Sequence, residues 1–285
     1  MTRLFYSLLI ALLLSSTLHA AQSTITEAEG YSCMGEDKSR KQTKDEAFSD
    51  AERKALERVV VHVKSETRIN NLELEKDIVE AYSLAKVKIL DSRELGWYKD
   101  EHSGDCVRVS IKAEVVPDEK AMERLGNDEK FTDDPSLPLS VKVWTDRKEY
   151  SDGQKVRIYI SGNKPFYARV LYKNAEGGIV QLLPNPFRLD NYFNGGMVYE
   201  IPSGNDRFDL EVAPPFGEEN VTVYASTTQL GDIDLEGADG VYQVRTRGAD
   251  IGTRTRGVVI RKKTDEGGSP ASEFFESSTV VRTGK

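Results

Sequence analysis

This chain of 285 residues is poor in histidine, in cysteine and in long apolar runs. Beyond residue 20, no apolar stretch approaches the roughly 20 residues that a membrane-spanning helix needs, so none is expected there. His62 and His102 are the only histidines in that part, which leaves a nucleophile or a metal ion few imidazole partners. No Gly-x-Ser-x-Gly, phosphate-binding glycine-rich or His-Glu-x-x-His motif occurs. These absences argue against the common hydrolases, nucleotide-binding enzymes and zinc proteases.

Positive charge is also in deficit. The chain has 39 Lys and Arg against 47 Asp and Glu, a formal net charge of −8. Because phosphate contacts need basic residues in excess, this balance excludes nucleic acid as the main partner. Apolar residues make up 38% and charged residues 30%, which is typical of a folded soluble chain rather than a disordered one.

Residues 1–20 have the pattern of a secretory signal peptide. Arg3 supplies a positive charge, residues 4–14 form an apolar run, and the segment ends in a small-residue cleavage site at Ala20. The run is too short to span a bilayer about 30 Å thick, so cleavage near Ala20 is favoured over an uncleaved anchor. No Cys follows the cleavage site, and a lipid anchor is therefore not expected. We predict a periplasmic protein, with secretion from the cell as the less favoured alternative.

Cys33 and Cys106 are the two cysteines of the chain. In an oxidising compartment an even pair is typical of a disulfide, and we predict one between them. Two buried thiols, or half of a metal site, are the alternatives. Cys33 ends an early strand and Cys106 begins a later one, so the two can approach each other if these strands are neighbours in a sheet.

Residues 22–121 have the pattern of an α+β domain. An early strand is expected at residues 25–34, followed by a long helix in which small apolar residues recur every four positions over residues 47–63. Such small residues allow a helix to lie close to a sheet. Thr43 and Glu46 have capping-box spacing near its start, and a start a few residues earlier is also compatible.

The rest of this domain is expected to hold a second helix and a β-hairpin. An amphipathic pattern spans residues 74–85, and the hairpin strands are expected at residues 87–98 and 107–115. Residues 122–138 then form a polar linker that is rich in charge and proline.

Residues 139–285 are expected to form an all-β, sandwich-like domain. Short alternating segments separated by turn residues are typical of this class. The expected strands cover residues 141–143, 155–160, 168–172, 179–183, 197–201, 208–212 and 221–225, with further candidates at 241–244, 258–260 and 274–281.

Two resemblances to bacterial envelope families follow from these patterns. The N-terminal half resembles the N-terminal domain of flagellar assembly protein T and the related surface-lipoprotein family. The residues that carry this resemblance are Gly30, Tyr31, Ala47, Ala51 and Ala55. Unlike that family, this chain has Cys33 and lacks a lipid-anchor cysteine.

The C-terminal half resembles the bacterial domain-of-unknown-function family 4384 over residues 139–226. This resemblance implies a β-sandwich-like module that occurs beside other domains and has no assigned catalytic residue. The segments that carry it are Tyr150-Ser-Asp-Gly153, Val156-Arg-Ile-Tyr159, Ala168–Tyr172, Leu182-Leu-Pro-Asn185, Ile201-Pro202, Pro214-Pro-Phe-Gly217 and Val221–Ser226.

Three parts of the sequence are candidate binding sites: an aromatic groove, a basic segment and, described afterwards, an acidic loop. Aromatic side chains, above all Tyr192 and Tyr199, can line a groove for a small ligand or a polysaccharide, although aromatics of a small β-domain more often fill its core. The aromatics considered for this groove are Tyr150, Phe187, Tyr192, Phe193 and Tyr199. A glycine-flanked basic segment can dock an anionic partner, or it can simply balance the acidic remainder of the chain. Its residues are Arg245, Arg247, Arg254, Arg256, Arg261, Lys262 and Lys263.

Asp232, Asp234 and Glu236 alternate before Gly237, as at the start of a calcium-binding loop. The twelfth position is Gln243 instead of Glu, so an acidic surface loop is the simpler interpretation. No cofactor is predicted.

The function that the sequence favours is that of a non-enzymatic, exported envelope protein. It would act as a binding or assembly module for a protein or a cell-envelope polymer. The alternatives are a small-ligand or polysaccharide-binding protein that uses the aromatic groove and, less favoured, an unrecognised hydrolase.

Overall fold

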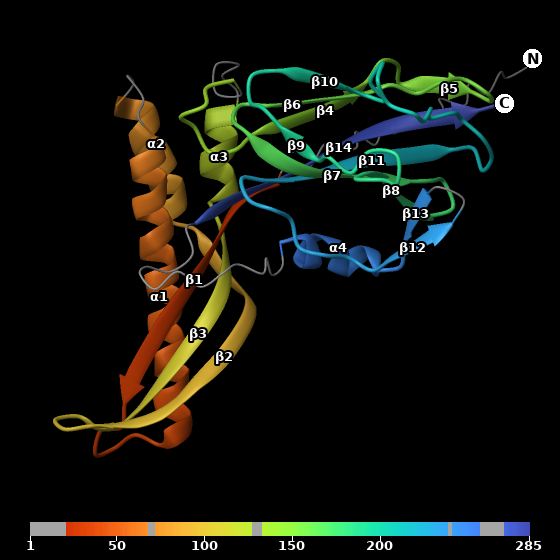
Figure 1. Cartoon of the computed structure of the whole chain (residues 1–285). Helices are drawn as coiled ribbons and strands as arrows, with labels where there is room; N and C mark the ends of the chain where they lie inside the picture. Colours follow the sequence, from red (N-terminus) through yellow and green to blue (C-terminus); the bar gives the residue numbers. More distant parts are fainter. Residues whose placement is uncertain (1–20, 68–71, 127–132, 239–240, 257–270) are drawn as a thin grey trace, which may run out of the picture.

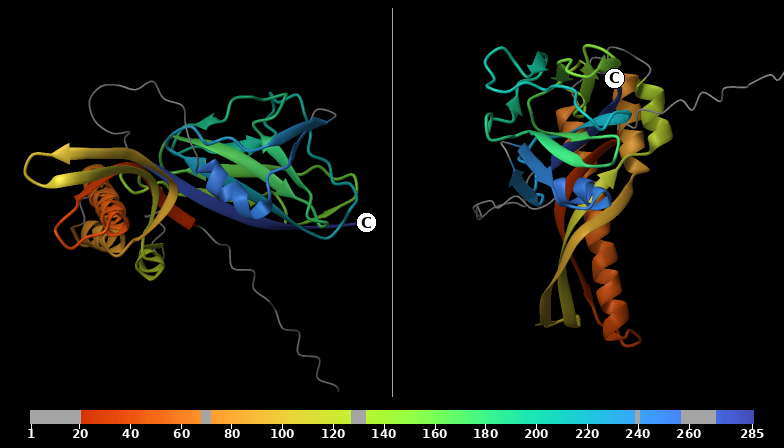
Figure 2. Two further views of the ribbon diagram at one scale, coloured as in Figure 1. Left: turned by 90° about the horizontal axis from the view of Figure 1, so that it is seen from below. Right: turned by 90° about the vertical axis from the view of Figure 1, so that its right-hand side faces the viewer.

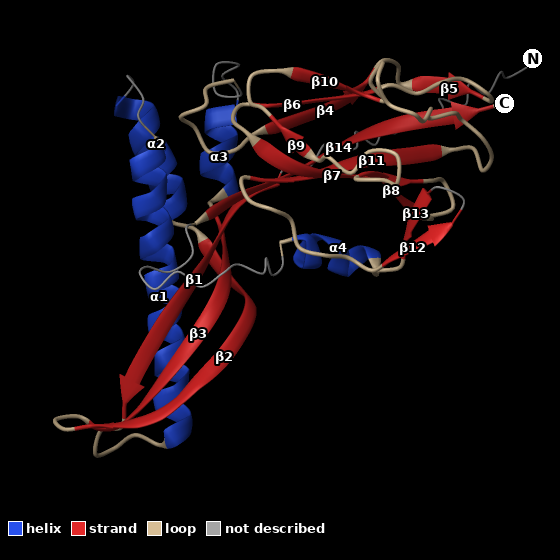
Figure 3. Ribbon diagram, viewed as in Figure 1, coloured by secondary structure: helices blue, strands red, loops and turns tan. Residues whose placement is uncertain are grey.

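The computed structural model of the chain describes residues 21–67, 72–126, 133–238, 241–256 and 271–285. The helices are α1 (Arg40–Glu66), α2 (Leu72–Ser83), α3 (Glu119–Gly126) and α4 (Gly248–Thr255). The strands of the N-terminal half are β1 (Ala21–Cys33), β2 (Lys86–Asp100) and β3 (Gly104–Val116). The remaining strands are β4 (Val141–Thr145), β5 (Glu149–Ser151), β6 (Ile158–Gly162), β7 (Phe166–Lys173), β8 (Ile179–Leu183), β9 (Tyr192–Phe193), β10 (Val198–Ile201), β11 (Glu218–Ser226), β12 (Leu235–Ala238), β13 (Val241–Val244) and β14 (Ser272–Gly284). The fold class is the predicted one, an α+β N-terminal half followed by a β-rich half (Figures 1 and 3).

One sheet of 11 strands runs through both halves of the molecule. Its order is β12-β13-β8-β7-β11-β14-β1-β3-β2, with β9 paired to β7 and β5 paired to β14. The strands β1 and β14 join the halves, because residues 21–25 pair antiparallel with residues 272–276. The N-terminal half extends from this pairing as an arm of three strands with α1 and α2 on one face (Figures 1 and 2). The predicted domains therefore share a backbone ladder.

Helix α1 packs closely on β1 and β3. The predicted every-fourth-residue stripe, from Ala47 to Val63, is buried, which confirms the helix and its inner face. Gly30 of β1 lies under this stripe, and a Cβ placed there would collide with the backbone of Ala47 and Ala51. The helix begins at Arg40, where Ser39 and Gln42 form the capping box. The pair Thr43 and Glu46 lies inside the helix instead.

The core of the β-rich half lies between the long sheet and a second sheet of order β10-β6-β4. Side chains at alternate positions of the facing strands fill this space, as in a sandwich. Its main contributors are Val141, Val143, Ile158, Ile160, Phe166, Ala168, Val170, Phe193, Ile201, Val221, Val223 and Phe275.

Some local expectations differ from the structure. Residues 208–212 form no regular strand; an isolated bridge joins Lys155 to Glu211, and the N–H of Val156 donates to the Leu210 carbonyl beside it. The half expected to be all-β includes the short helix α4. Helix α3 extends into the expected linker, and Leu137 at the far end of that linker is buried against α1 and α2. The expected strand at residues 258–260 lies outside the described residues. Among the described helices, none is both long and apolar enough to cross a membrane.

Candidate functional site

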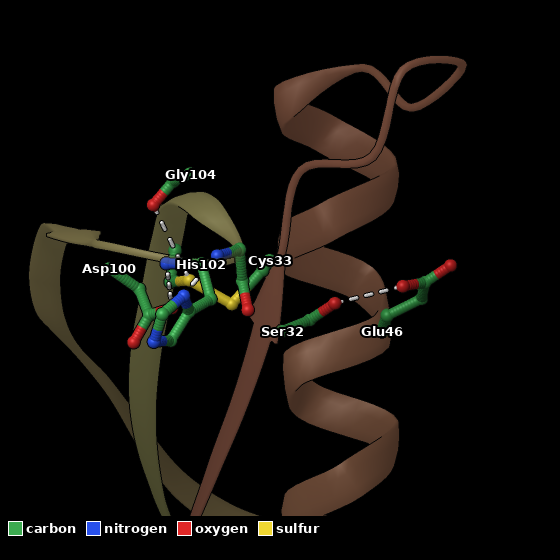
Figure 4. Close-up of a disulfide and its surroundings, with 8 residues drawn as sticks. Ser32, Cys33, Glu46, Asp100, His102 and Gly104 are labelled. Atoms are coloured by element: carbon green, nitrogen blue, oxygen red, sulfur yellow. Dashed lines mark hydrogen bonds between the residues drawn. A yellow bond between two sulfur atoms is a disulfide. The ribbon is translucent and has the colours of Figure 1, made fainter.

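The predicted disulfide is present at the far end of the N-terminal arm (Figure 4). Cys33 of β1 and Cys106 of β3 are direct partners in the strand ladder, with Cα atoms 3.9 Å apart. Cys106 is buried and Cys33 is partly exposed. Beside the bridge, the hydroxyl of Ser32 donates a hydrogen bond to the Glu46 carboxylate on α1 at 2.8 Å. The bridge links β1 to its neighbour β3 close to the turn of the β2–β3 hairpin.

A buried ion pair lies on the α1 side of the β1–β14 pairing. Glu273 of β14 is 4% exposed, and Lys164 places its Nζ 3.1 Å from both carboxylate oxygens. The N–H of Leu139 donates to the same carboxylate at 2.5 Å, and His62 Nε2 lies 3.5 Å from it. Burial by itself raises the pKa of Glu273, but the contacts from His62 and Lys164 outweigh it and hold the pKa below its ordinary value.

A second buried ion pair lies on the opposite face of the same pairing. Arg256, next to the C-terminal end of α4, contacts the Glu114 carboxylate through Nε and stacks over the Phe274 ring at 4.2 Å. Glu114 also accepts a hydrogen bond from the Ser23 hydroxyl at 2.8 Å, and Lys88 Nζ lies 3.7 Å away. The place where the two halves meet therefore carries a buried charge pair on each face.

The turn between β6 and β7 holds the end of the expected linker. Asn163 is 3% exposed, and its Nδ2 donates to the carbonyls of Asp134, Leu137 and Pro138 at 2.9–3.2 Å. Its Oδ1 accepts a hydrogen bond from the Ser140 N–H at 2.8 Å. Since Lys164 is the next residue, one turn both secures the linker and supplies the cation for Glu273.

These contacts fit a structural role better than acid–base chemistry. The oxygens of Glu273 accept hydrogen bonds from Lys164 and from the Leu139 N–H, with His62 nearby, and the carboxylate is almost completely buried. A buried carboxylate is held ionised only by such donors, so each pair restricts how the two halves can be arranged. We interpret the junction as a positioning device for the surfaces on either side.

The arginines of the basic segment differ in exposure: some lie on the surface and Arg256 points inward. Arg254 pairs with Asp234 at 2.6 Å and Arg245 with Glu236 at 2.5 Å, all with exposed side chains, and Arg247 is exposed at the start of α4. Arg256 was expected on the surface, and this is wrong: its side chain is 11% exposed because Glu114 and Glu276 draw it inward. Residues 261–263 lie outside the described residues.

The two charged candidate sites thus neutralise each other in part. Asp234 and Glu236, expected to begin a calcium loop, are the ion-pair partners of the basic segment, and Asp232 lies near the buried Arg169. Across the described residues, no group of three or more His, Cys, Asp or Glu side chains is arranged to hold a metal ion. The geometry therefore lends the calcium hypothesis no support.

Replacing Arg256 should cost far more stability than replacing Arg254. Arg256→Ala leaves Glu114 buried with only Ser23 and the more distant Lys88, and we expect a loss of stability of about 3 kcal/mol, the lower end of the range for such a change. Arg254→Ala removes an exposed pair, for which about 0.5 kcal/mol is the expected scale. Urea denaturation of both variants measures the difference. Equal effects would contradict the placement of Arg256 in the interior.

The aromatic side chains do not assemble into the expected groove. Tyr150 and Phe193 are buried in the sandwich core, and Tyr199 packs edge-on against Phe193 with ring centroids 5.0 Å apart. Tyr192 is exposed beside Tyr167 at 5.1 Å, and Phe187 is exposed beside Phe208 at 6.3 Å. Two separate aromatic pairs are thus present at the surface, while the other rings stabilise the fold.

Exposed apolar side chains are concentrated in residues 187–198, which include β9 and its flanking turns. Leu189 is 72% exposed, and four further large apolar side chains of this segment are also exposed, whereas Phe193 points into the core. The members of this exposed apolar segment are Phe187, Leu189, Tyr192, Met197 and Val198. Leu189, Met197 and Val198 were not predicted from the sequence as binding residues. Their position next to turn residues such as Pro186 and Gly196, where a buried strand is not expected, could have indicated their exposure.

A surface hollow of about 330 Å³ lies between β1 and α1 on the arm. It is lined by Glu29, Lys54, Glu57, Arg58 and Val61. Arg58 donates to the Glu27 carbonyl, and Asp50 accepts from the Tyr31 N–H, so α1 side chains satisfy part of this strand edge. The lining mixes both signs of charge with an exposed valine, and it favours no particular ligand.

Comparison with known proteins gives one family match. A family model described as "Domain of unknown function (DUF4384)" matches residues 149–229. The match lies within the β-rich half and contains the exposed apolar segment and Lys164. No curated protein matches the chain. The resemblance of the N-terminal half to the flagellar assembly protein T domain stays a prediction.

Proposed function

We propose that this protein is a non-enzymatic, exported envelope protein that binds another protein through the exposed apolar segment. The observation that carries this proposal is the concentration of exposed apolar side chains in residues 187–198. Exposed apolar patches on soluble proteins mark interaction sites, since leaving them in water is unfavourable. Phe187, Tyr192 and Met197 have the character of interface residues, because aromatic and methionine side chains are enriched at protein interfaces.

Two further features support export and binding without catalysis. The disulfide fits an oxidising compartment and agrees with the signal-peptide pattern of residues 1–20. The two histidines available as bases are separated, with His62 at the buried junction and His102 in the exposed hairpin turn. The junction would then hold the binding surface at a set orientation to the arm.

Site-specific crosslinking tests the proposal. A photoreactive residue at Leu189 should crosslink one envelope protein that a photoreactive residue at Val241, which is also exposed but lies on β13, does not. The captured protein, once purified, should bind the wild-type chain, and its affinity for a Phe187→Ser/Leu189→Ser variant should fall at least about tenfold, as expected for hot-spot residues. Val241→Ser is the matched control.

Two outcomes would overturn the proposal. Identical crosslinking patterns from Leu189 and Val241 would show that the segment is not a binding surface. Loss of binding to a purified envelope polysaccharide on Tyr192→Ala, with protein binding absent, would favour the ligand-binding alternative based on the Tyr192–Tyr167 pair.

A further inference from the structure

Strand β2 forms a long edge of the sheet in the N-terminal arm. It covers 15 residues, and within the described part of the chain it pairs only with β3 (Figure 1). The opposite edge of the sheet, β12, has only 4 residues. An unpaired edge presents a row of N–H and C=O groups that another strand can bind. Because β2 is long, its unpaired edge offers many such groups to a partner strand.

Two β-bulges bracket the middle of β2. The register against β3 shifts between Ile89 and Asp91 and again between Glu94 and Gly96, so the two shifts are centred between Ser92 and Arg93. A bulge bends its strand and blunts the edge against flat strands, so we expect a partner strand that bends at similar places. A second copy of β2, reversed about Ser92 or about Arg93, is such a strand.

The register with β3 also shows which β2 side chains share a face. Residues paired with Ser110 and Lys112 lie on the face away from α1, because the intervening Ile111 packs toward α1. By this alternation, Asp91 and Arg93 share the face away from α1. Reversal about Ser92 places each of them opposite the other in the second copy, on the same face.

The outer part of β2 agrees with the same register. Reversal about Ser92 places Val87 opposite Trp97 of the second copy, and both of these side chains face α1. It also brings Ile89 opposite Leu95, and both are exposed in the single chain. Apolar side chains therefore meet apolar side chains at these two pairs, while Leu90 lies opposite Glu94 between them and the central charged pairs.

Charge favours Ser92 over Arg93 as the centre. Around Ser92, Asp91 lies opposite Arg93 of the second copy, and symmetry repeats the pair. Around Arg93, two guanidinium groups would face each other directly, which is unfavourable. Asp91, Ser92 and Arg93 are exposed, and no ion pair of Arg93 occurs within the described residues. The Asp91 carboxylate accepts a hydrogen bond from the Ser92 N–H at 2.9 Å.

We propose that two copies of this chain associate edge to edge through β2, antiparallel and with a twofold axis at Ser92. The contact uses the same residues on both copies, so it closes after two chains. It covers both long edges and leaves the short β12 edges at the ends of the joined sheet.

Charge reversal with the full, disulfide-bonded chain tests this. Sedimentation equilibrium should show a dimer for the wild type. Arg93→Asp or Asp91→Arg alone should raise the dissociation constant by about tenfold or more, because two attractive cross-strand pairs become repulsive. Mixing the two single variants should restore association, since every facing pair is again of opposite charge. The D91R/R93D double variant should also dimerise like the wild type.

Crosslinking provides an independent readout. Ser92→Cys should form an intermolecular disulfide, because the two Ser92 positions meet at the axis. Ser103→Cys, in the exposed hairpin turn, should not. Circular-dichroism spectra that match the wild type would show that each variant is folded, because the melting temperature itself changes with association. A monomeric wild type at every concentration, or a dimer that is insensitive to the charge reversals, would overturn the proposal and leave β2 free for a strand of another protein.

Discussion

Removing the Cys33–Cys106 disulfide is expected to lower the free energy of unfolding by about 4 kcal/mol. The bridge joins residues 73 positions apart, and a closed loop of this length strongly limits the unfolded chain. This figure is an upper value, since residual structure in the unfolded chain reduces it. A loss on this scale is large beside a total stability of about 5–15 kcal/mol.

The double variant Cys33→Ala/Cys106→Ala measures this effect by urea denaturation. Alanine at both positions avoids a lone thiol and avoids burying a hydroxyl at position 106. Ser103→Ala, in the nearby hairpin turn, is the control and should change stability by less than about 0.5 kcal/mol. Thiol labelling of the unreduced, unfolded wild type must find no free thiol. Two free thiols per chain would show that the bridge does not form.

Replacing Glu273 by glutamine is expected to cost about 3–5 kcal/mol, the range for breaking a buried ion pair by removing one partner. The glutamine side chain would keep an oxygen for the Leu139 N–H, so the loss of stability would report the removal of the negative charge. Lys164, which is 8% exposed, would be left buried without its counter-charge. Because Glu273 lies on β14 beside β1, we expect the contact between the two halves to weaken first.

The pH dependence of this loss has a definite sign. The pKa of Glu273 in the folded protein lies below its ordinary value of 4.5. Its contribution to the free energy of unfolding is therefore complete at pH values above 4.5. The contribution disappears as the pH falls through the folded pKa. The stability difference between wild type and Glu273→Gln should therefore be constant near neutral pH and should shrink in acid.

Denaturation curves of both proteins, recorded from neutral pH into acid, test this. Glu218→Gln, at an exposed carboxylate on β11, is the matched control and should behave like the wild type. Equal losses for the two variants at neutral pH would contradict the buried pair. A difference that grows as the pH falls would contradict the assigned sign.

Local patterns in the sequence determined the elements of the N-terminal arm. The four-residue spacing of Ala47, Ala51 and Ala55 specifies a helix with a narrow apolar face, and the alternation of residues 107–115 specifies a strand with one buried face. The early position of Cys33 and the later position of Cys106, each at a strand end, were enough to predict the bridge. The helix start that the structure selects is the earlier of the two compatible ones, because Ser39 and Gln42 repeat the same capping spacing four residues before Thr43 and Glu46.

Tertiary structure alone decided how the two halves are joined and which charges are buried. The pairing of β1 with β14 brings together the two ends of the described chain, and no local period records such a contact. Arg256 has the same glycine-flanked setting as Arg254, yet its side chain is only 11% exposed, because Glu114 from β3 and Phe274 from β14 converge on it. A charged side chain enters the interior only where distant elements supply its partners, so its burial depends on contacts that the surrounding sequence does not contain.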